Sequence, residues 1–281
     1  MLIEIGQGII ERGLIYAIVV IGIYLTSRVI KFDDLTVEGS FGIGGAMMAF
    51  LLIRGINPWL SLIGALIAGA LSGVATALLH TKLKLNNLIS GIVVTTALFS
   101  ITLKLGGANQ TLTGMKSVFD LALPAASLKF LCILLPLCLV TLYTTRWLLQ
   151  TQIGFMLKAL GDSPQMIANI GKRADRYTIL ALALSNMLTA LAGALFVQYV
   201  GYFSIWAGVG TLIIALAGLM LAEVFDQHLG VALIIGAILY QIVIAATFEF
   251  QLDPELNKLV TALLIIGLLL LKKKTSTAVE R

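Results

Sequence analysis

Charged residues are scarce in this chain of 281 residues, and long apolar runs take their place. Only 12% of its residues are charged, against about a quarter in soluble domains, and 59% are hydrophobic, with a mean hydropathy of +1.02. A soluble fold cannot hide so much apolar surface, so the composition excludes a soluble protein. Several runs approach the roughly 18 to 20 apolar residues that cross a hydrocarbon core as a helix. They lack the alternation of barrel strands, so we expect an all-α, polytopic integral membrane protein.

Cysteine and histidine are equally rare, with two of each. Cys132 and Cys138 lie six residues apart in one apolar run and would point in different directions on a helix, so neither a disulfide nor a metal pair is expected. The phosphate-binding pattern Gly-x-x-x-x-Gly-Lys-Ser/Thr is missing, which argues against ATP hydrolysis by this chain. We find no nucleophile–base pair, and we expect no catalytic residue, no metal, no cofactor and no enzyme activity.

The apolar runs predict nine membrane spans, in a range of about eight to ten, within one transmembrane domain over residues 1–281. Glycines weaken the second span and the seventh is short, so either is a candidate for a broken or re-entrant helix. The predicted spans cover residues 13–31, 37–54, 58–80, 87–105, 128–149, 177–201, 207–224, 229–247 and 257–271.

Basic residues give the chain a net charge of +5, and they lie in short loops. There they set membrane orientation by the excess of Lys and Arg in cytoplasmic loops, so no nucleic-acid partner is expected. Placing segment 150–176 in the cytoplasm puts 13 of the 19 basic residues inside and 6 outside. We therefore predict an external N-terminus and a cytoplasmic C-terminus.

Spans 1–4 and 6–9 look like two copies of one plan. Each copy starts with a long span and continues with a glycine-marked segment, 39–45 in the first and 208–211 in the second. Because span 5 lies between them, the second copy enters the membrane from the opposite side. This is the inverted repeat of many transporters.

Two connections between spans are longer than a turn, and long loops in a compact domain are usually functional or disordered. Residues 106–127 are predicted to lie outside and residues 150–176 inside. In the second connection a helical stretch breaks at Gly161 and restarts. Asp162 or Ser163 suits the N-cap and Pro164 suits the first helical position.

The restarted helix is expected to end at about Ile170, with Gly171 as its stop. A short capped helix on the cytoplasmic face suits docking into a groove on a soluble partner. An ordinary loop with one helical turn is the alternative that the residues alone leave open.

The order Lys-Ala-Leu-Gly-Asp-Ser-Pro-Gln-Met at 158–166, with Gly171 and the later Leu-Ser-Asn at 184–186, resembles permeases of the branched-chain amino acid and ribose class of ABC importers. Asp-Leu-Thr-Val-Glu-Gly-Ser-Phe at 34–41 is similar to a subgroup linked to uptake of amino acids, including aromatic ones. The resemblance covers most of the chain, from about residue 16 to 271. One departure is the basic pair at 172–173, where an apolar pair is expected.

The resemblance implies a permease subunit of the bacterial inner membrane that moves a small polar solute, an amino acid, inward by alternating access. It also implies two cytoplasmic ATP-binding subunits that use the ATP, an external substrate-binding protein, and a second permease copy, giving a homodimer in the lipid bilayer. The residues that it assigns to ATPase coupling are Gly161, Asp162, Ser163, Pro164, Gln165, Met166 and Gly171.

Four polar residues are candidates for a translocation path: Glu38, Asn87, Asn186 and Gln198. They could equally well lie at the interface or form hydrogen bonds between helices. An ion-coupled secondary transporter is the alternative function, but it should place an acid or a cluster of carbonyl ligands near mid-membrane. No acidic residue falls in the middle of a predicted span. An intramembrane enzyme would need paired reactive residues, which are missing.

Overall fold

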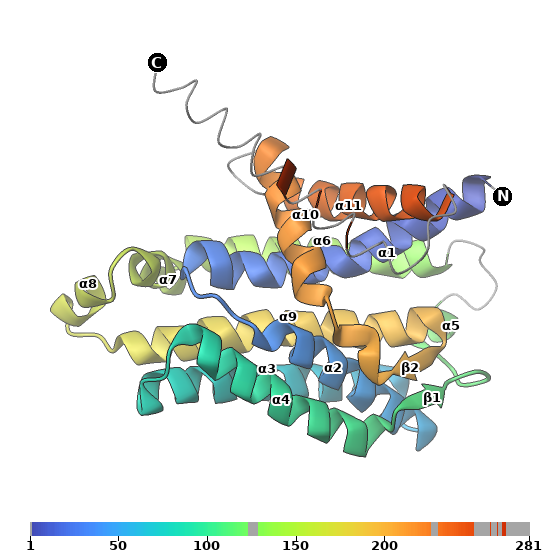
Figure 1. Ribbon diagram of the computed structural model, residues 1–281, viewed down its shortest axis with the longest axis horizontal. Helices are drawn as coiled ribbons and strands as arrows, with labels where there is room; N and C mark the ends of the chain where they lie inside the picture. The colour runs from blue at the N-terminus through green and yellow to red at the C-terminus, as the bar shows by residue number, and fades with distance from the viewer. Residues whose placement is uncertain are drawn as a thin grey trace.

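Helices make up most of the computed structural model, which describes residues 2–122, 129–225 and 230–249, together with residues 259, 263, 266 and 267 (Figure 1). The first part of the chain holds α1 (Leu2–Ile23), the π-helix η1 (Tyr24–Val29), α2 (Thr36–Ile53), α3 (Pro58–Leu83), α4 (Asn87–Gly106), β1 (Asn109–Thr111) and α5 (Val118–Ala122). The second part holds α6 (Lys129–Gln150), α7 (Gln152–Asp162), α8 (Pro164–Asn169), α9 (Ala174–Val200), β2 (Tyr202–Ser204), the 3₁₀ helix η2 (Ile205–Gly208), α10 (Thr211–Phe225) and α11 (Ala232–Glu249).

Seven helical stretches of the described chain are long and apolar enough to cross a membrane, which confirms an all-α, polytopic membrane protein. An eighth apolar helix, Ala232–Thr247, is shorter. The predicted ninth span, 257–271, lies outside the described residues apart from four single positions. The outer faces of α3, α4 and α6 expose large apolar side chains, as lipid contact requires.

The first span begins earlier than predicted, because α1 starts at Leu2 rather than near residue 13. The residues before residue 13 include Glu4, Gln7, Glu11 and Arg12, which lower the hydropathy of that stretch. In the structure Glu11 is buried, with 4% of its surface exposed. Its carboxylate accepts a 2.8 Å hydrogen bond from the Gln7 amide one turn earlier, which satisfies it within the helix.

The two spans that were candidates for a broken helix behave differently. The second is a continuous helix, α2, although a non-helical linker, residues 31–35, leads into it. The seventh is broken: η2 ends at Gly208, and α10 starts only after Val209 and Gly210, where Gly210 has a φ of +88°. A non-glycine residue would be strained in that conformation.

Small residues let α9 pack closely against its neighbours in the middle of the bundle (Figure 1). A Cβ on Gly73 of α3 would lie 2.1 Å from the Leu182 carbonyl oxygen of α9. A Cβ on Gly44 of α2 would come equally close to the carbonyl oxygen of Ala190. Such spacing gives van der Waals contact between backbones, which drives helix association in lipid.

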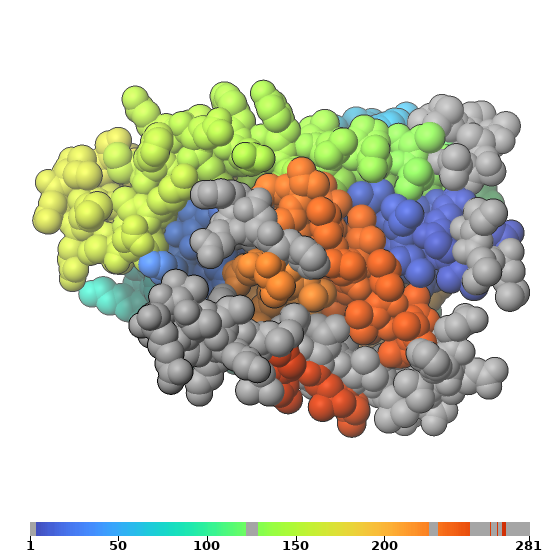
Figure 2. All heavy atoms as spheres, turned by 90° about the horizontal axis from the view of Figure 1, so that it is seen from above, coloured from blue at the N-terminus to red at the C-terminus, as the bar shows by residue number. Residues whose placement is uncertain are grey.

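The bundle has two distinct ends (Figure 1). At one end α7 and α8 extend past the long helices. At the opposite end β1 and β2 pair antiparallel, with Gln110 opposite Phe203. α10 and α11 lie across one side of the bundle, on a face that also shows α6 and α1 (Figure 2).

Candidate functional site

The segment α7–α8 has the predicted short helix, with two corrections. Ser163 occupies the N-cap position, but its side chain makes no capping hydrogen bond. The predicted break at Gly161 is wrong, because α7 continues through Asp162. The chain turns at Ser163, whose φ of −160° and ψ of 115° are extended, and Pro164 opens α8. Gly171 follows α8 with a φ of +76°, a left-handed stop.

One side of α8 is anchored and the other is free of the bundle. Ile167 is fully buried against the cluster that includes Leu157 and Leu160 of α7. Gln165 and Met166 are exposed, with half of the Met166 surface accessible. A short helix held by one apolar residue therefore presents a mixed polar and apolar face beyond the membrane helices (Figure 1).

Gly161 makes a close backbone contact between this segment and η1. A Cβ at Gly161 would lie 2.1 Å from the Val29 carbonyl oxygen at the end of η1. The neighbouring Asp162 carboxylate accepts a 2.9 Å hydrogen bond from the Lys31 ammonium. This ion pair is well exposed and contributes little to stability, so the close backbone contact is the main attachment.

A buried polar network lies deeper in the bundle, where α2, α3 and α9 meet. The Asp34 carboxylate accepts hydrogen bonds from the Asn186 amide at 2.6 Å and from the Thr36 backbone N–H at 2.8 Å. The Asn186 carbonyl oxygen accepts one from the Ser40 hydroxyl at 2.6 Å. Ser40 and Ser72 share a further hydrogen bond at 2.5 Å. The network satisfies its buried polar groups, as a low-dielectric interior requires.

Asp34 is an acidic residue of this network that none of the predicted spans includes. It falls between two predicted spans, so the sequence places it in a loop. The structure folds the 31–35 linker back into the bundle, where Asp34 is 5% exposed beside Asn186. Asn186 is the thirteenth of the 27 residues of α9, so this carboxylate lies near the middle of that helix.

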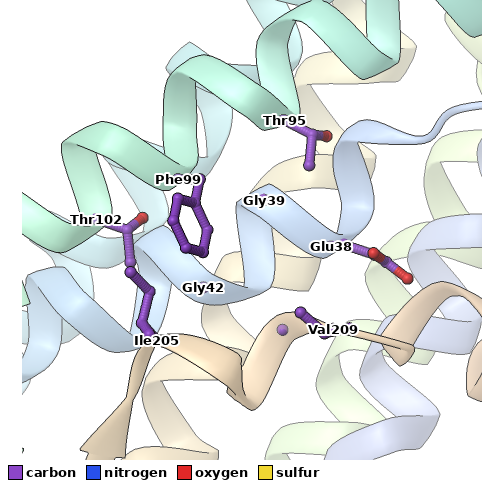
Figure 3. Close-up of a pocket in the computed structure, with 9 residues that line it drawn as sticks. Glu38, Gly39, Gly42, Thr95, Phe99, Thr102, Ile205 and Val209 are labelled. Atoms are coloured by element: carbon purple, nitrogen blue, oxygen red, sulfur yellow. The ribbon is translucent and has the colours of Figure 1, made fainter. Parts of the chain in front are cut away.

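The two glycine-marked segments of the predicted repeat touch one another. A Cβ on Gly208 would lie 2.4 Å from the Glu38 carbonyl oxygen. The Glu38 carboxylate in turn accepts a 2.9 Å hydrogen bond from the Gly210 backbone N–H at the break before α10. Figure 3 shows Glu38 reaching from α2 toward the segment that carries Val209, and away from Phe99 and Thr102 of α4.

A larger cavity of about 490 Å³ opens on the other side of Glu38. This tyrosine-lined cavity lies among α1, α2, α9, α10 and α11. Among the described residues, its lining includes Arg12, Glu38 and several aromatic rings. The residues that line it are Arg12, Tyr16, Glu38, Phe196, Val200, Tyr202, Val209, Gly210, Ile213, Ile214, Tyr240, Gln241 and Ile244.

The four residues predicted to line a path do not meet in one place. Glu38 lines the tyrosine-lined cavity, and Asn186 belongs to the buried polar network. Asn87 opens α4 at the end of the bundle that carries α8. Gln198 lies near the opposite end, where its amide oxygen accepts a 2.8 Å hydrogen bond from the Val118 backbone N–H. Glu38 thus lines the larger cavity, and Gln198 lines a smaller one of about 160 Å³.

Sequence reasoning missed most of the cavity lining. Arg12 precedes the predicted first span, which places it in an external segment, and Tyr16 and Tyr240 resemble ordinary span residues. Because α1 starts at Leu2, Arg12 lies within a helix of the bundle. Only the glycine-marked segments pointed to this place, through Glu38 and Gly210. Within the described parts of the chain, no group of three or more His, Cys, Asp or Glu residues is placed to hold a metal ion.

Comparisons with known proteins agree on one family. The family model described as the branched-chain amino acid transport system permease component matches residues 7–269. A tyrosine transport system permease protein of Clostridioides difficile is 32% identical over 267 residues, covering 93% of this chain and 89% of that protein. An autoinducer 2 import system permease protein of Yersinia pseudotuberculosis is 28% identical over 263 residues, covering 88% of this chain and 71% of that protein. No solved structure matches significantly.

Proposed function

Because this chain belongs to the branched-chain amino acid transport system permease family, we propose that it moves an amino acid inward across the bacterial inner membrane, by alternating access driven by separate ATPase subunits. The family makes it a transport permease of an ABC-type system and not an enzyme. The geometry of α7 and α8 is the observation that carries the coupling part of this proposal.

The exposed face of α8 suits a protein partner. Gln165 and Met166 are exposed while Ile167 holds the helix in place. A mixed apolar and polar helix face that lies beyond the membrane helices fits the helix-in-groove mode of recognition. The ATP-binding subunit that such an import system implies is the partner we assign to it.

A continuous set of contacts leads from α8 to the membrane interior. Gly161 packs on the end of η1, and η1 continues into the linker that carries Asp34. Asp34 binds Asn186 of α9, and the helix that follows the linker carries Glu38 at the cavity. Movement of α8 would therefore act on both α9, through Asn186, and α2, which carries Glu38 at the cavity. An ATPase shifts the equilibrium only by binding one arrangement better than the other.

Two considerations support an amino acid as the solute. The relative from Clostridioides difficile is named a tyrosine transport permease. The tyrosine-lined cavity also offers both signs of charge, from Arg12 and Glu38, as a zwitterion requires. We also propose a homodimer and an external substrate-binding protein, with the N-terminus outside and the C-terminus in the cytoplasm.

Substitution on α8 tests the coupling proposal. Met166→Glu places a charge in the centre of the proposed docking face, and we expect it to abolish ATP-driven uptake and co-purification of the ATP-binding subunit. Leu83→Glu is the matched control, because Leu83 is also an exposed apolar residue at the same end of the bundle. It should leave both measurements near the wild-type values.

Purification in mild detergent from the native membrane measures co-purification of the ATP-binding subunit, and uptake is measured on vesicles of the same membrane. Equal amounts of ATP-binding subunit with the wild type and Met166→Glu would contradict the assignment of α8. If neither protein carries such a subunit, even after gentle cross-linking, the ATPase-driven mechanism itself fails.

A further inference from the structure

We propose that the tyrosine-lined cavity is a substrate site of this permease and that it holds an aromatic amino acid in its zwitterionic form. Arg12 binds the α-carboxylate, Glu38 binds the α-ammonium group, and the tyrosine rings contact the aromatic side chain. The proposal rests on the amino-acid transport proposed above, and it adds the place and the binding groups. An aromatic solute is also what the resemblance of segment 34–41 implies.

The position of the cavity is the first argument. It lies where the two glycine-marked segments meet, at the break between η2 and α10. In transporters built from inverted repeats, substrate sites form at such interrupted helices in the two halves. Glu38 and Gly210 adjoin or belong to the two segments, and both line the cavity.

The heights of the two charged residues are the second argument. Tyr16 of α1 and Phe41 of α2 stack with parallel rings whose centroids lie 6.1 Å apart, so these residues are level with one another. Arg12 lies four residues before Tyr16 and Glu38 three before Phe41, on helices that run in opposite directions (Figure 1). At about 1.5 Å per residue their backbones differ in height by roughly 10 Å. Two long side chains at that separation can bind the opposite charges of one solute between them.

Glu38 is oriented independently of any solute. One of its carboxylate oxygens accepts a hydrogen bond from the Gly210 N–H, which holds the side chain next to the break before α10. Figure 3 shows this carboxylate pointing away from the small apolar recess lined by Phe99 and Thr102. A carboxylate held in this way needs little reordering when it binds an ammonium group, and preorganisation of this kind improves affinity.

The lining and size of the cavity indicate an aromatic side chain. Tyr16, Tyr202 and Tyr240 line it together with Phe196, and aliphatic residues complete the wall. Ring pairs in offset or tilted geometry are more favourable than the apolar area alone suggests. A volume of about 490 Å³ falls in the range of about 300–1,000 Å³ for small-molecule sites.

Direct binding to the permease tests the proposal without the external binding protein, which would otherwise select the solute first. The complex of permease and ATP-binding subunit in lipid nanodiscs is mixed with L-tyrosine, L-leucine or tyramine, and saturation-transfer NMR detects weak binding. We expect L-tyrosine to bind clearly better than L-leucine, which lacks the ring, and better than tyramine, which lacks the carboxylate.

Charge-removing variants locate the site. We expect Arg12→Gln and Glu38→Gln each to weaken L-tyrosine binding about tenfold, as the loss of a charge-assisted hydrogen bond predicts. Glutamine at position 38 can still accept the Gly210 N–H, so the helix break is preserved. Arg54→Gln is the control, because it removes the same charge from the end of α2 without lining the cavity. It should leave L-tyrosine binding unchanged.

Two outcomes would overturn the proposal. Unchanged L-tyrosine binding in both cavity variants would show that the solute does not bind in this cavity. Equal binding of L-leucine and L-tyrosine would show that the site does not select an aromatic side chain. Uptake by the complete transporter in proteoliposomes separates these failures from failure of the proposed function. If the wild type transports an amino acid while the cavity variants behave normally, only the site is wrong. If it transports no amino acid, the proposed function is wrong.

Discussion

Asp34 shows at the scale of single residues how a polar group becomes part of a membrane bundle. Its carboxylate is buried, yet Asn186 and the Thr36 backbone each donate a hydrogen bond to it. A buried acceptor without such donors would cost about 1–3 kcal/mol, and more when charged. The linker before α2 is therefore held inside the bundle by specific bonds as well as by apolar packing.

Gly161 gives the prediction at this scale. Its backbone lies so close to the Val29 carbonyl that even the methyl group of alanine would have to displace one of the two segments. We expect Gly161→Leu to reduce ATP-driven uptake at least tenfold while the protein still inserts in the membrane. Uptake and membrane content are measured on the same vesicles.

Gly55 provides the comparison, because a Cβ added there would have no neighbour within 4 Å although its φ is positive. Gly55→Asn, which tolerates that φ, should retain most of the uptake. Normal uptake by Gly161→Leu would remove this contact from the coupling mechanism.

At the scale of elements, short segments close the end of the bundle opposite α8. Gln198 of α9 binds the first backbone N–H of α5, and β1 pairs with β2. Asp120 of α5 accepts hydrogen bonds from the Lys129 ammonium at 2.5 Å and from the Ser117 hydroxyl at 2.6 Å. These bonds attach α5 to the start of α6.

The pH dependence of this attachment is predictable. The hydrogen bond from Lys129, followed by that from Ser117, lowers the pKa of Asp120 from 3.8 to about 2. A depressed carboxyl pKa stabilises the fold above the unfolded value, and that stabilisation is lost as the pH falls from about 4 to about 2. We expect Asp120→Asn to make the melting temperature of the detergent-purified protein less sensitive to pH in this window.

Lys129→Gln removes the main cause of the lowered Asp120 pKa. It should also make the melting temperature less dependent on pH in this window. Identical dependence of the melting temperature on pH for the wild type and both variants, between about pH 4 and about pH 2, would show that this attachment contributes nothing measurable.

At the scale of the whole molecule, the long helices run between two ends of the bundle that differ in structure (Figure 1). The end with α8 presents an exposed helix, and the other end presents the β1–β2 pair. Arg28 of η1 forms an ion pair with Glu223 near the end of α10. Helix α10 therefore joins the helix break at its start to η1, which contacts the α7–α8 segment. The cavity lies between these connections, beside α1, α2 and α10.

Membrane orientation is the prediction at this scale. In a background of Cys132→Ser and Cys138→Ser, we expect Thr113→Cys to react with a membrane-impermeant maleimide added to intact cells. Lys82→Cys should react only after the cells are opened. Both positions are exposed, so accessibility within the protein does not limit labelling. The reverse pattern would invert the proposed topology.

Much of the fold was predictable from the sequence because the bilayer restricts the choice so strongly. Long apolar runs require helices, and the Ser163, Pro164 and Gly171 signals depend only on local backbone preferences. Helix α8 was therefore predicted almost to the residue. The start of α1 was not, because its polar residues are satisfied by partners that hydropathy cannot identify.

The lipid surroundings, the helical class and the short helix α8 all follow from the amino-acid sequence, since they depend on composition and on neighbours along the chain. Three features could be known only from the folded molecule: Asp34 is an interior residue, Arg12 and Glu38 share a cavity, and the two glycine-marked segments touch. These features depend on close approach between α1, α2, α9 and α10. Such approach arises from packing between distant segments, which leaves no periodic pattern in the sequence.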